Sequence, residues 1–145
     1  MRPLLTMIGL FEAVTGVALL LSPSVTVSLL IGAPADTPAG LVVTRVAGAA
    51  LLALGVACWL ARSDGQSRTT AGVVTAMLLY NFVAATLLAY AGLGVGLAGI
   101  GLWPAVVLHI ALAGWCVACL WSKSMKRARF TPSAARPFES ERGAN

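Results

Sequence analysis

Four strongly polar side chains interrupt runs of otherwise apolar residues, one in each run: Glu12, Arg45, Asn81 and His109. Such groups can form a polar pocket that opens outward and binds a small ligand, and a carboxylate beside an imidazole can carry a proton. Tyr80 precedes Asn81 and lies about 100° from it around a helix, so it could reach the same site. The alternative is that these side chains only hold neighbouring helices in register.

The runs that carry these residues have the length of membrane-spanning helices. The chain has 145 residues, of which 59% are hydrophobic and only 10% are charged. Soluble domains contain roughly a quarter charged residues, and a bilayer core needs about 20 apolar residues per helix. The sequence therefore predicts an all-α fold, a four-helix transmembrane bundle within residues 1–122. The expected spans are about 4–21, 41–61, 70–91 and 103–121.

The polar residues are expected to point into the bundle and to pair there. At 1.5 Å per residue, Glu12 and Arg45 differ in depth by roughly 7 Å, which an arginine side chain can bridge. We therefore expect these two residues to form an ion pair. Gly9 and Gly16 share a helix face with Glu12, and Gly48 shares one with Arg45. Because glycine lets a neighbouring backbone come close, these faces are expected to pack against other helices.

The distribution of basic residues predicts the orientation in the membrane. If the chain crosses four times, the Lys and Arg residues near helix ends lie on one side, whereas the opposite loops, about 22–40 and 92–102, contain none. The positive-inside rule then places both termini in the cytoplasm, which suggests an inner membrane protein. The basic residues are Arg2, Arg62, Arg68, Lys123, Lys126, Arg127 and Arg129.

A short helix is expected between the first two spans. Ser22 can cap its start, Pro23 suits its first turn, and Gly32 follows its end. A helix of about nine residues is too short to cross a bilayer, so we expect it to lie at the extracytoplasmic interface. Thr37 and Pro38 are expected to begin the second span in the same way.

Residues 123–145 form a polar, basic segment that is predicted to be a largely disordered cytoplasmic tail. Lys123, Lys126, Arg127 and Arg129 would attract anionic lipid headgroups at roughly 1 kcal/mol each. The alternative is an ordinary positively charged flank after the last span. Since the membrane organises the charge, no nucleic-acid partner is expected.

Several chemistries are not expected from this sequence. With three cysteines and one histidine on the other side of the membrane, no zinc site can be assembled. The G-x-G-x-x-G pattern at residues 94–99 follows no strand, so it predicts a flexible or close-packed turn rather than a nucleotide site. There is no Ser/His/Asp set. The sequence therefore predicts a protein without metal, cofactor or enzymatic activity.

The segments "GLFEAVTG", "RVAGAALLALG", "YN" at Tyr80–Asn81 and "WPAVVLHI" resemble small four-helix bacterial membrane proteins of the DoxX-like group and its relatives. That resemblance implies a four-helix bundle and association with redox partners. "FEAVTG" is also similar to the first helix of small multidrug transporters, whose membrane glutamate exchanges substrate and protons. Arg45 departs from that pattern, since an arginine partner would hold Glu12 ionised and oppose proton exchange.

Three hypotheses follow from the sequence. The first is a non-enzymatic accessory subunit or small-ligand-binding bundle, built around a buried cluster of Glu12, Arg45, Asn81 and His109 with Tyr80 nearby. The second is a proton-coupled small-molecule transporter, and the third is a membrane subunit of a redox complex. The expected partners are the lipid bilayer and either another membrane protein or a second copy of this chain.

Overall fold

The computed structural model describes residues 1–65 and 67–129, which form helices joined by short connections. Four of the helices are long and apolar enough to cross a membrane, by length and composition, and the fifth is short. The prediction of an all-α chain with four long apolar helices is therefore confirmed. The helices are α1 (Arg2–Leu21), α2 (Pro23–Ile31), α3 (Pro38–Ala61), α4 (Arg68–Leu93) and α5 (Leu102–Arg129).

Local sequence signals explain where the helices begin and end. Helix α2 follows Ser22 and ends at Gly32, whose φ of 81° is the left-handed conformation that glycine adopts without strain. The Thr37 hydroxyl caps α3 by accepting a hydrogen bond from the backbone N–H of Gly40 at 3.0 Å. The boundaries expected from Gly32 and Thr37 are confirmed. The Ser22 hydroxyl, in contrast, makes no capping hydrogen bond.

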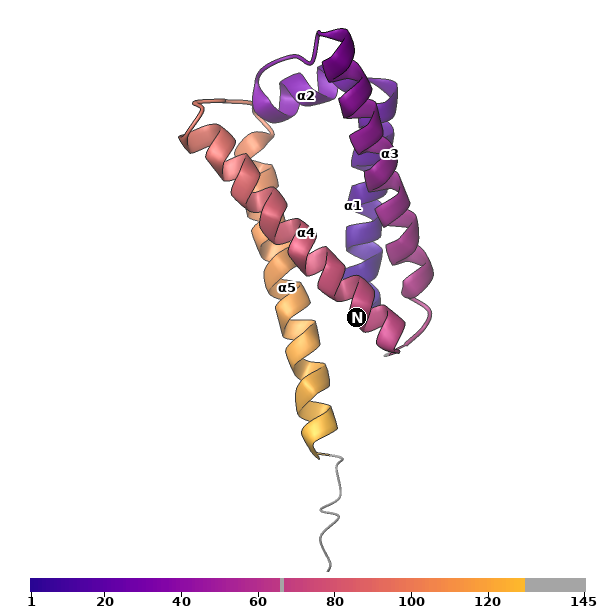
Figure 1. Ribbon diagram of the computed structural model, residues 1–145. Coiled ribbons are helices and arrows are strands. Elements are labelled where there is room, and N and C mark those ends of the chain that lie inside the picture. Colours follow the sequence, from indigo (N-terminus) through magenta and orange to yellow (C-terminus); the bar gives the residue numbers. More distant parts are fainter. Residues whose placement is uncertain (66, 130–145) are drawn as a thin grey trace, which may run out of the picture.

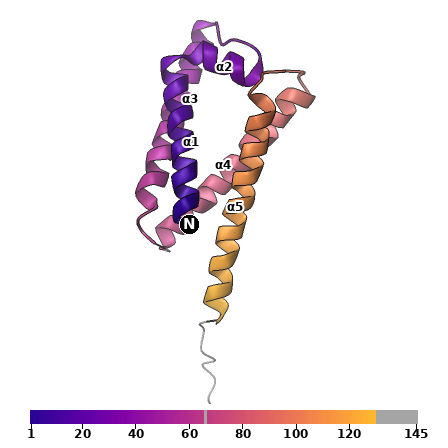
Figure 2. The ribbon, with the colours of Figure 1, turned by 180° about the vertical axis from the view of Figure 1, so that it is seen from behind.

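The long helices are arranged as two antiparallel pairs. Helix α1 packs along α3, and α4 packs along α5, whereas contacts between the two pairs are few (Figure 1). The pairs meet near the N-terminus and diverge toward α2 (Figure 2). Helix α2 crosses the far end and contacts all four long helices. The arrangement is therefore more open than a closed bundle.

Apolar side chains hold the two pairs together at the end where they meet. The core there includes Leu4 and Ile8 from α1, Cys58 from α3, Met77 from α4 and Cys116 from α5, all of them buried. These residues are close-packed aliphatic and sulfur-containing side chains. The core fixes one end of the molecule, and the other end depends on α2.

Helix α2 is attached to the connection between α4 and α5. The backbone N–H of Gly101 donates a hydrogen bond to the Leu29 carbonyl oxygen at 2.9 Å. A methyl group on Gly99 would overlap the carbonyl group of Leu30, so only glycine fits at this contact. The glycine-rich run that includes Gly99 is therefore a close-packed connection.

Helix α5 continues to Arg129, about two turns past the expected end of the fourth span. No proline or glycine interrupts the sequence between residues 122 and 131, which explains the longer helix. Residues 130–145 of the predicted tail lie outside the described part of the chain, as do the side chains of Lys123, Lys126, Arg127 and Arg129.

Backbone contact between glycines brings α1 and α3 together. A methyl group on Gly16 would lie 2.6 Å from the Gly48 carbonyl oxygen, and one on Gly55 would lie 2.8 Å from the Gly9 carbonyl oxygen. Carbon and oxygen atoms cannot approach so closely, so each position excludes any side chain. The close packing expected around these glycines is confirmed, and it resembles the small-residue interfaces of membrane helices.

We predict that Gly16→Ala and Gly48→Ala each destabilise the protein by about 1–3 kcal/mol, because an added methyl group must push α1 and α3 apart. Gly72→Ala is the matched control, since a methyl group on Gly72 of α4 meets nothing within 4 Å. Thermal unfolding in detergent measures the difference. Equal midpoints for all three variants would contradict the close contact.

Candidate functional site

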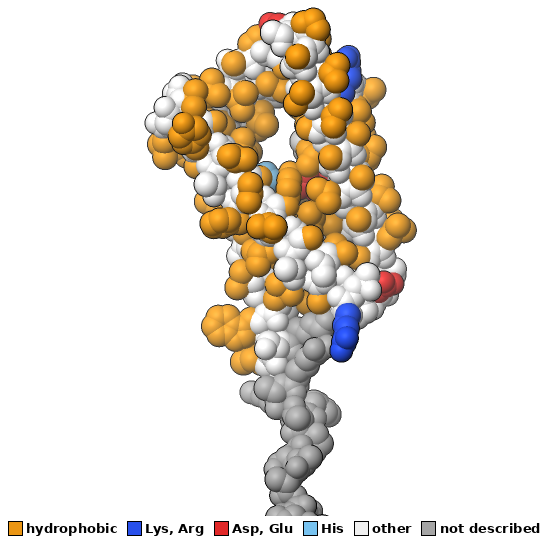
Figure 3. Space-filling view, viewed as in Figure 1, with side chains coloured by type: hydrophobic (Ala, Val, Ile, Leu, Met, Phe, Trp, Pro, Cys, Tyr) orange, Lys and Arg blue, Asp and Glu red, His pale blue; other side chains and the backbone are white. Residues whose placement is uncertain are grey.

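A cavity of about 330 Å³ lies where the two helix pairs diverge beneath α2. This volume is at the small end of the range for ligand pockets, about 300–1,000 Å³. All five helices contribute to its walls, which are mostly leucine and alanine side chains. Figure 3 shows the opening between the pairs, with a histidine and an acidic side chain at its edge. Its polar lining residues are Glu12, Thr15, Tyr80 and His109.

The Glu12 carboxyl group is buried and bound to a tyrosine. Glu12 lies on the buried face of α1, together with Ile8, Gly9 and Gly16, and is only 4% exposed. The hydroxyl group of Tyr80 on α4 faces the carboxyl group and is placed to donate a hydrogen bond to it. The partner of Glu12 is therefore a neutral hydroxyl from the opposite helix pair.

Asn81 and His109 form the second half of the polar site. Asn81 is fully buried, and its amide nitrogen donates to the Met77 carbonyl oxygen at 2.7 Å. The remaining amide oxygen of Asn81 lies 2.8 Å from His109 Nδ1. Because that oxygen can only accept, the hydrogen-bond pattern assigns the proton to Nδ1. In the neutral imidazole, Nε2 is then an acceptor.

The rings of Tyr80 and His109 connect the two halves. Their centroids are 5.7 Å apart and their planes meet at 79°, an edge-to-face arrangement. Glu12, Tyr80, Asn81 and His109 thus form one continuous set across α1, α4 and α5, which we call the polar cluster. Four of the five residues expected at the site are brought together, and Tyr80 occupies its centre.

Arg45 is the expected site residue that the structure places elsewhere. It is exposed, and its Nε donates to the Leu20 carbonyl oxygen at 3.4 Å, near the α2 end of α1. Leu20 is eight residues beyond Glu12, about 12 Å along the helix. The expected ion pair between Glu12 and Arg45 is therefore wrong. The glycine contacts, which set Gly16 against Gly48, place Arg45 about two turns from Glu12.

Thr15 is a cavity residue that the sequence analysis did not select. It lies three residues after Glu12, so both side chains lie on the same face of α1. The i, i+3 spacing from Glu12 is the sequence signal that could have identified Thr15 as a site residue. A threonine in an apolar helix is common, however, because its hydroxyl can bond to its own backbone, so residue type alone does not identify it.

The cysteines lie in the apolar core rather than at the cavity. Cys58 and Cys116 are buried, and Cys119 is partly buried beside them. Over residues 1–65 and 67–129, no three His, Cys, Asp or Glu side chains come close enough together to hold a metal ion. The cysteines of this part of the chain act as small apolar packing groups.

Comparison with known proteins identifies no relative for this chain: no family model, no curated protein and no solved structure matches it. The resemblance to DoxX-like proteins therefore stays a prediction. The geometry of the cavity is the basis for any functional argument.

We predict that Asn81→Ala destabilises the protein by about 1–3 kcal/mol, because it leaves Nδ1 of the partly buried His109 without its partner. Thr86→Ala is the control, since exposed Thr86 on the same helix bonds only to the Phe82 carbonyl oxygen. Nitrogen NMR of labelled His109 provides a second measurement. The wild-type protein should show the Nδ1–H tautomer, and the variant should lose this preference. An Nε2–H tautomer in the wild type would contradict the assigned network.

Proposed function

We propose that this chain is an integral membrane protein that spans the bilayer four times and binds a small, largely apolar molecule between its two helix pairs. The observation that carries the proposal is the leucine-rich cavity with the polar cluster at its wall. Ligand sites combine such apolar walls with a few polar groups that orient the ligand. The cluster ties Glu12 to Tyr80 and His109 to Asn81, which suits recognition better than catalysis.

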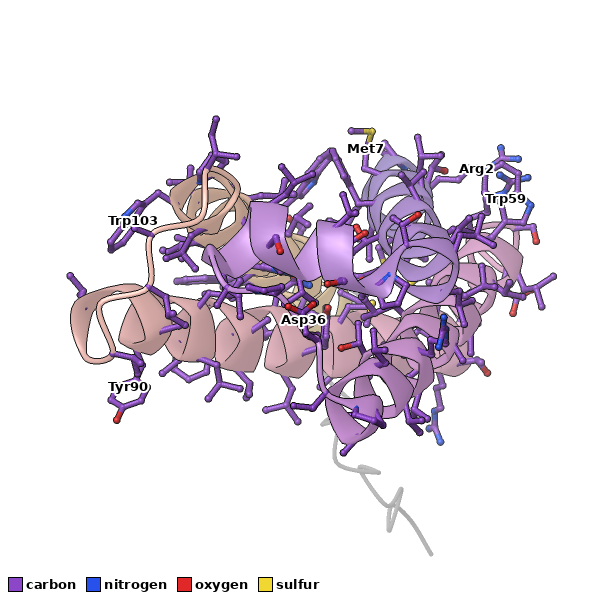
Figure 4. All side chains as sticks on the ribbon, turned by 90° about the horizontal axis from the view of Figure 1, so that it is seen from above. Arg2, Met7, Asp36, Trp59, Tyr90 and Trp103 are labelled. Atoms are coloured by element: carbon purple, nitrogen blue, oxygen red, sulfur yellow. The ribbon has the colours of Figure 1, made fainter. Side chains whose placement is uncertain are left out.

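The outer surface of the long helices supports a membrane setting. Large apolar side chains such as Leu60, Phe82 and Val107 are each about two-thirds exposed. Soluble monomers rarely expose contiguous apolar surface on this scale, whereas lipid chains would cover it favourably. Tyr90 and Trp103 point outward from one end of the molecule (Figure 4). Aromatic side chains at such positions are typical of the membrane–water boundary.

The alternating directions of the long helices support an orientation. Arg2, Arg62 and Arg68 lie at the end where α1 and α4 begin and α3 finishes. A surface cavity lined by Arg2 and Arg62 opens there, and the Arg62 guanidinium stacks 3.2 Å from the Trp59 ring centroid. By the positive-inside rule this end faces the cytoplasm, in a cell (inner) membrane, with both termini on that side. Helix α2 then lies at the extracytoplasmic surface.

A second candidate function is proton-coupled transport of the bound molecule. An arginine partner would oppose proton exchange at Glu12, but Arg45 bonds to Leu20 instead. A carboxyl group whose partner is a neutral hydroxyl can bind a proton in one state and the ligand in another. Uptake into proteoliposomes driven by a pH gradient would support this function, and its absence, with ligand binding intact, would leave a binding protein. The redox-subunit alternative depends on the family resemblance alone.

We predict that Ala105→Phe weakens ligand binding, because Ala105 lines the cavity and a phenyl ring would occupy part of it. Decanol is a suitable neutral probe, and its binding is measured as a rise in unfolding temperature in lipid nanodiscs. Ala111→Phe is the control, since Ala111 is exposed on the same helix. Wild type and Ala111→Phe should be stabilised alike. Equal stabilisation of Ala105→Phe would show that decanol binds elsewhere.

We also predict that Asp36→Cys reacts with a membrane-impermeant maleimide in right-side-out vesicles and that Ser63→Cys reacts only after permeabilisation. Asp36 and Ser63 are both exposed, near opposite ends of α3. The wild-type protein is the control, because it reports any labelling of the buried Cys58 and Cys116 and the partly buried Cys119. The reverse labelling pattern would invert the proposed orientation.

A further inference from the structure

Glu12 has no positively charged partner among the side chains that the structure describes. Its hydrogen bond comes from the neutral hydroxyl of Tyr80, and Arg45 bonds to the α1 backbone at Leu20, away from Glu12. Burial of an ionised carboxylate without a cation is costly. A cation that arrives with the ligand would supply the missing charge.

The other polar atoms at the cavity wall are mainly acceptors. The Nδ1–H of His109 is bound to Asn81, so Nε2 offers a lone pair. When the Tyr80 hydroxyl donates to the Glu12 carboxylate, the Tyr80 oxygen has only its lone pairs to offer. The Thr15 hydroxyl can donate or accept. A ligand whose polar group donates hydrogen bonds fits this wall better than one whose polar group accepts them.

The remaining wall favours hydrocarbon. Leu51, Leu88 and Leu108 come from three different helices and surround the space beside the polar cluster. The space opens sideways between the helix pairs (Figure 3), at the level of their apolar outer surfaces. A molecule dissolved in the lipid could therefore enter without crossing water.

We propose that the cavity binds a lipophilic amine, with its protonated nitrogen held by the Glu12 carboxylate and its hydrocarbon part among the leucines. His109 Nε2 and the Thr15 hydroxyl would accept further hydrogen bonds from the nitrogen. This inference rests on the proposed ligand-binding function and adds the chemical class of the ligand.

Three probes with the same alkyl chain test the head-group preference: decylamine, decanol and decanoate. Each is titrated against the full-length protein in phosphatidylcholine nanodiscs, and binding is measured from the unfolding temperature. A charge-assisted hydrogen bond should make decylamine bind at least about tenfold more tightly than decanol. Decanoate should bind most weakly, because its charge repels that of Glu12.

Two variants locate the effect at Glu12. Glu12→Gln keeps the shape of the side chain and should weaken decylamine binding about tenfold while decanol binding changes less than about threefold. Thr15→Lys places an ammonium group one turn from Glu12 and should remove decylamine binding while the protein stays folded. Asp36→Asn is the control, because Asp36 is an exposed carboxylate outside the cavity and bonds to Ser24.

The outcomes separate the two proposals. If neither decanol nor decylamine binds, or if both bind equally to Ala105→Phe, the cavity is not a ligand site and the proposed function is wrong. If decanol binds in the cavity but decylamine shows no advantage, or keeps it in Glu12→Gln and Thr15→Lys, the amine inference is wrong and the binding function stands. If Glu12→Gln does not fold, the binding of decylamine to Thr15→Lys tests the amine inference by itself.

Discussion

The contact between the backbones of α1 and α3 is the constraint on which the rest of the structure depends. Gly9 and Gly16 lie directly against Gly55 and Gly48, so the rotation and register of α1 are fixed to within the size of a methyl group. Glu12 lies between the two glycines of α1, and its direction is therefore fixed as well. With α1 held so closely to α3, its carboxylate meets α4 instead, where Tyr80 supplies the hydrogen bond.

The two helix pairs have different internal chemistry. The first pair, α1 and α3, is held by backbone contact, and the polar side chains that it contributes to the cavity lining are Glu12 and Thr15. The second is held in part by the partly buried hydrogen bond between Asn81 and His109, which also orients the imidazole. Hydrogen bonds between membrane helices contribute modestly, on the order of 1 kcal/mol. Between the two pairs, buried apolar side chains pack together at the end where the pairs meet.

The helices and their ends could be predicted from the sequence because run length, proline position and capping residues are local signals. The cluster was partly predictable, since strongly polar residues in apolar helices usually turn inward, as Glu12, Asn81 and His109 do and Arg45 does not. The pairing of Glu12 with Arg45 was not, because depth along a helix says nothing about the register between helices. That register follows from the glycine contacts, which could be used only once α1 and α3 were known to be neighbours. The divergence of the pairs likewise depends on tertiary packing, and no single helix encodes it.

Helix α2 determines how far apart the two pairs can be at the end where they diverge. It follows α1 directly and is bonded at its other end to the α4–α5 connection through Leu29 and Gly101. Nine helical residues measure about 13 Å, a fixed spacing that side-chain changes inside the cavity do not alter. In a homologous chain, one additional turn in this segment would widen the spacing between the two pairs by about 5 Å, so the length of this short helix would set the width of the cavity.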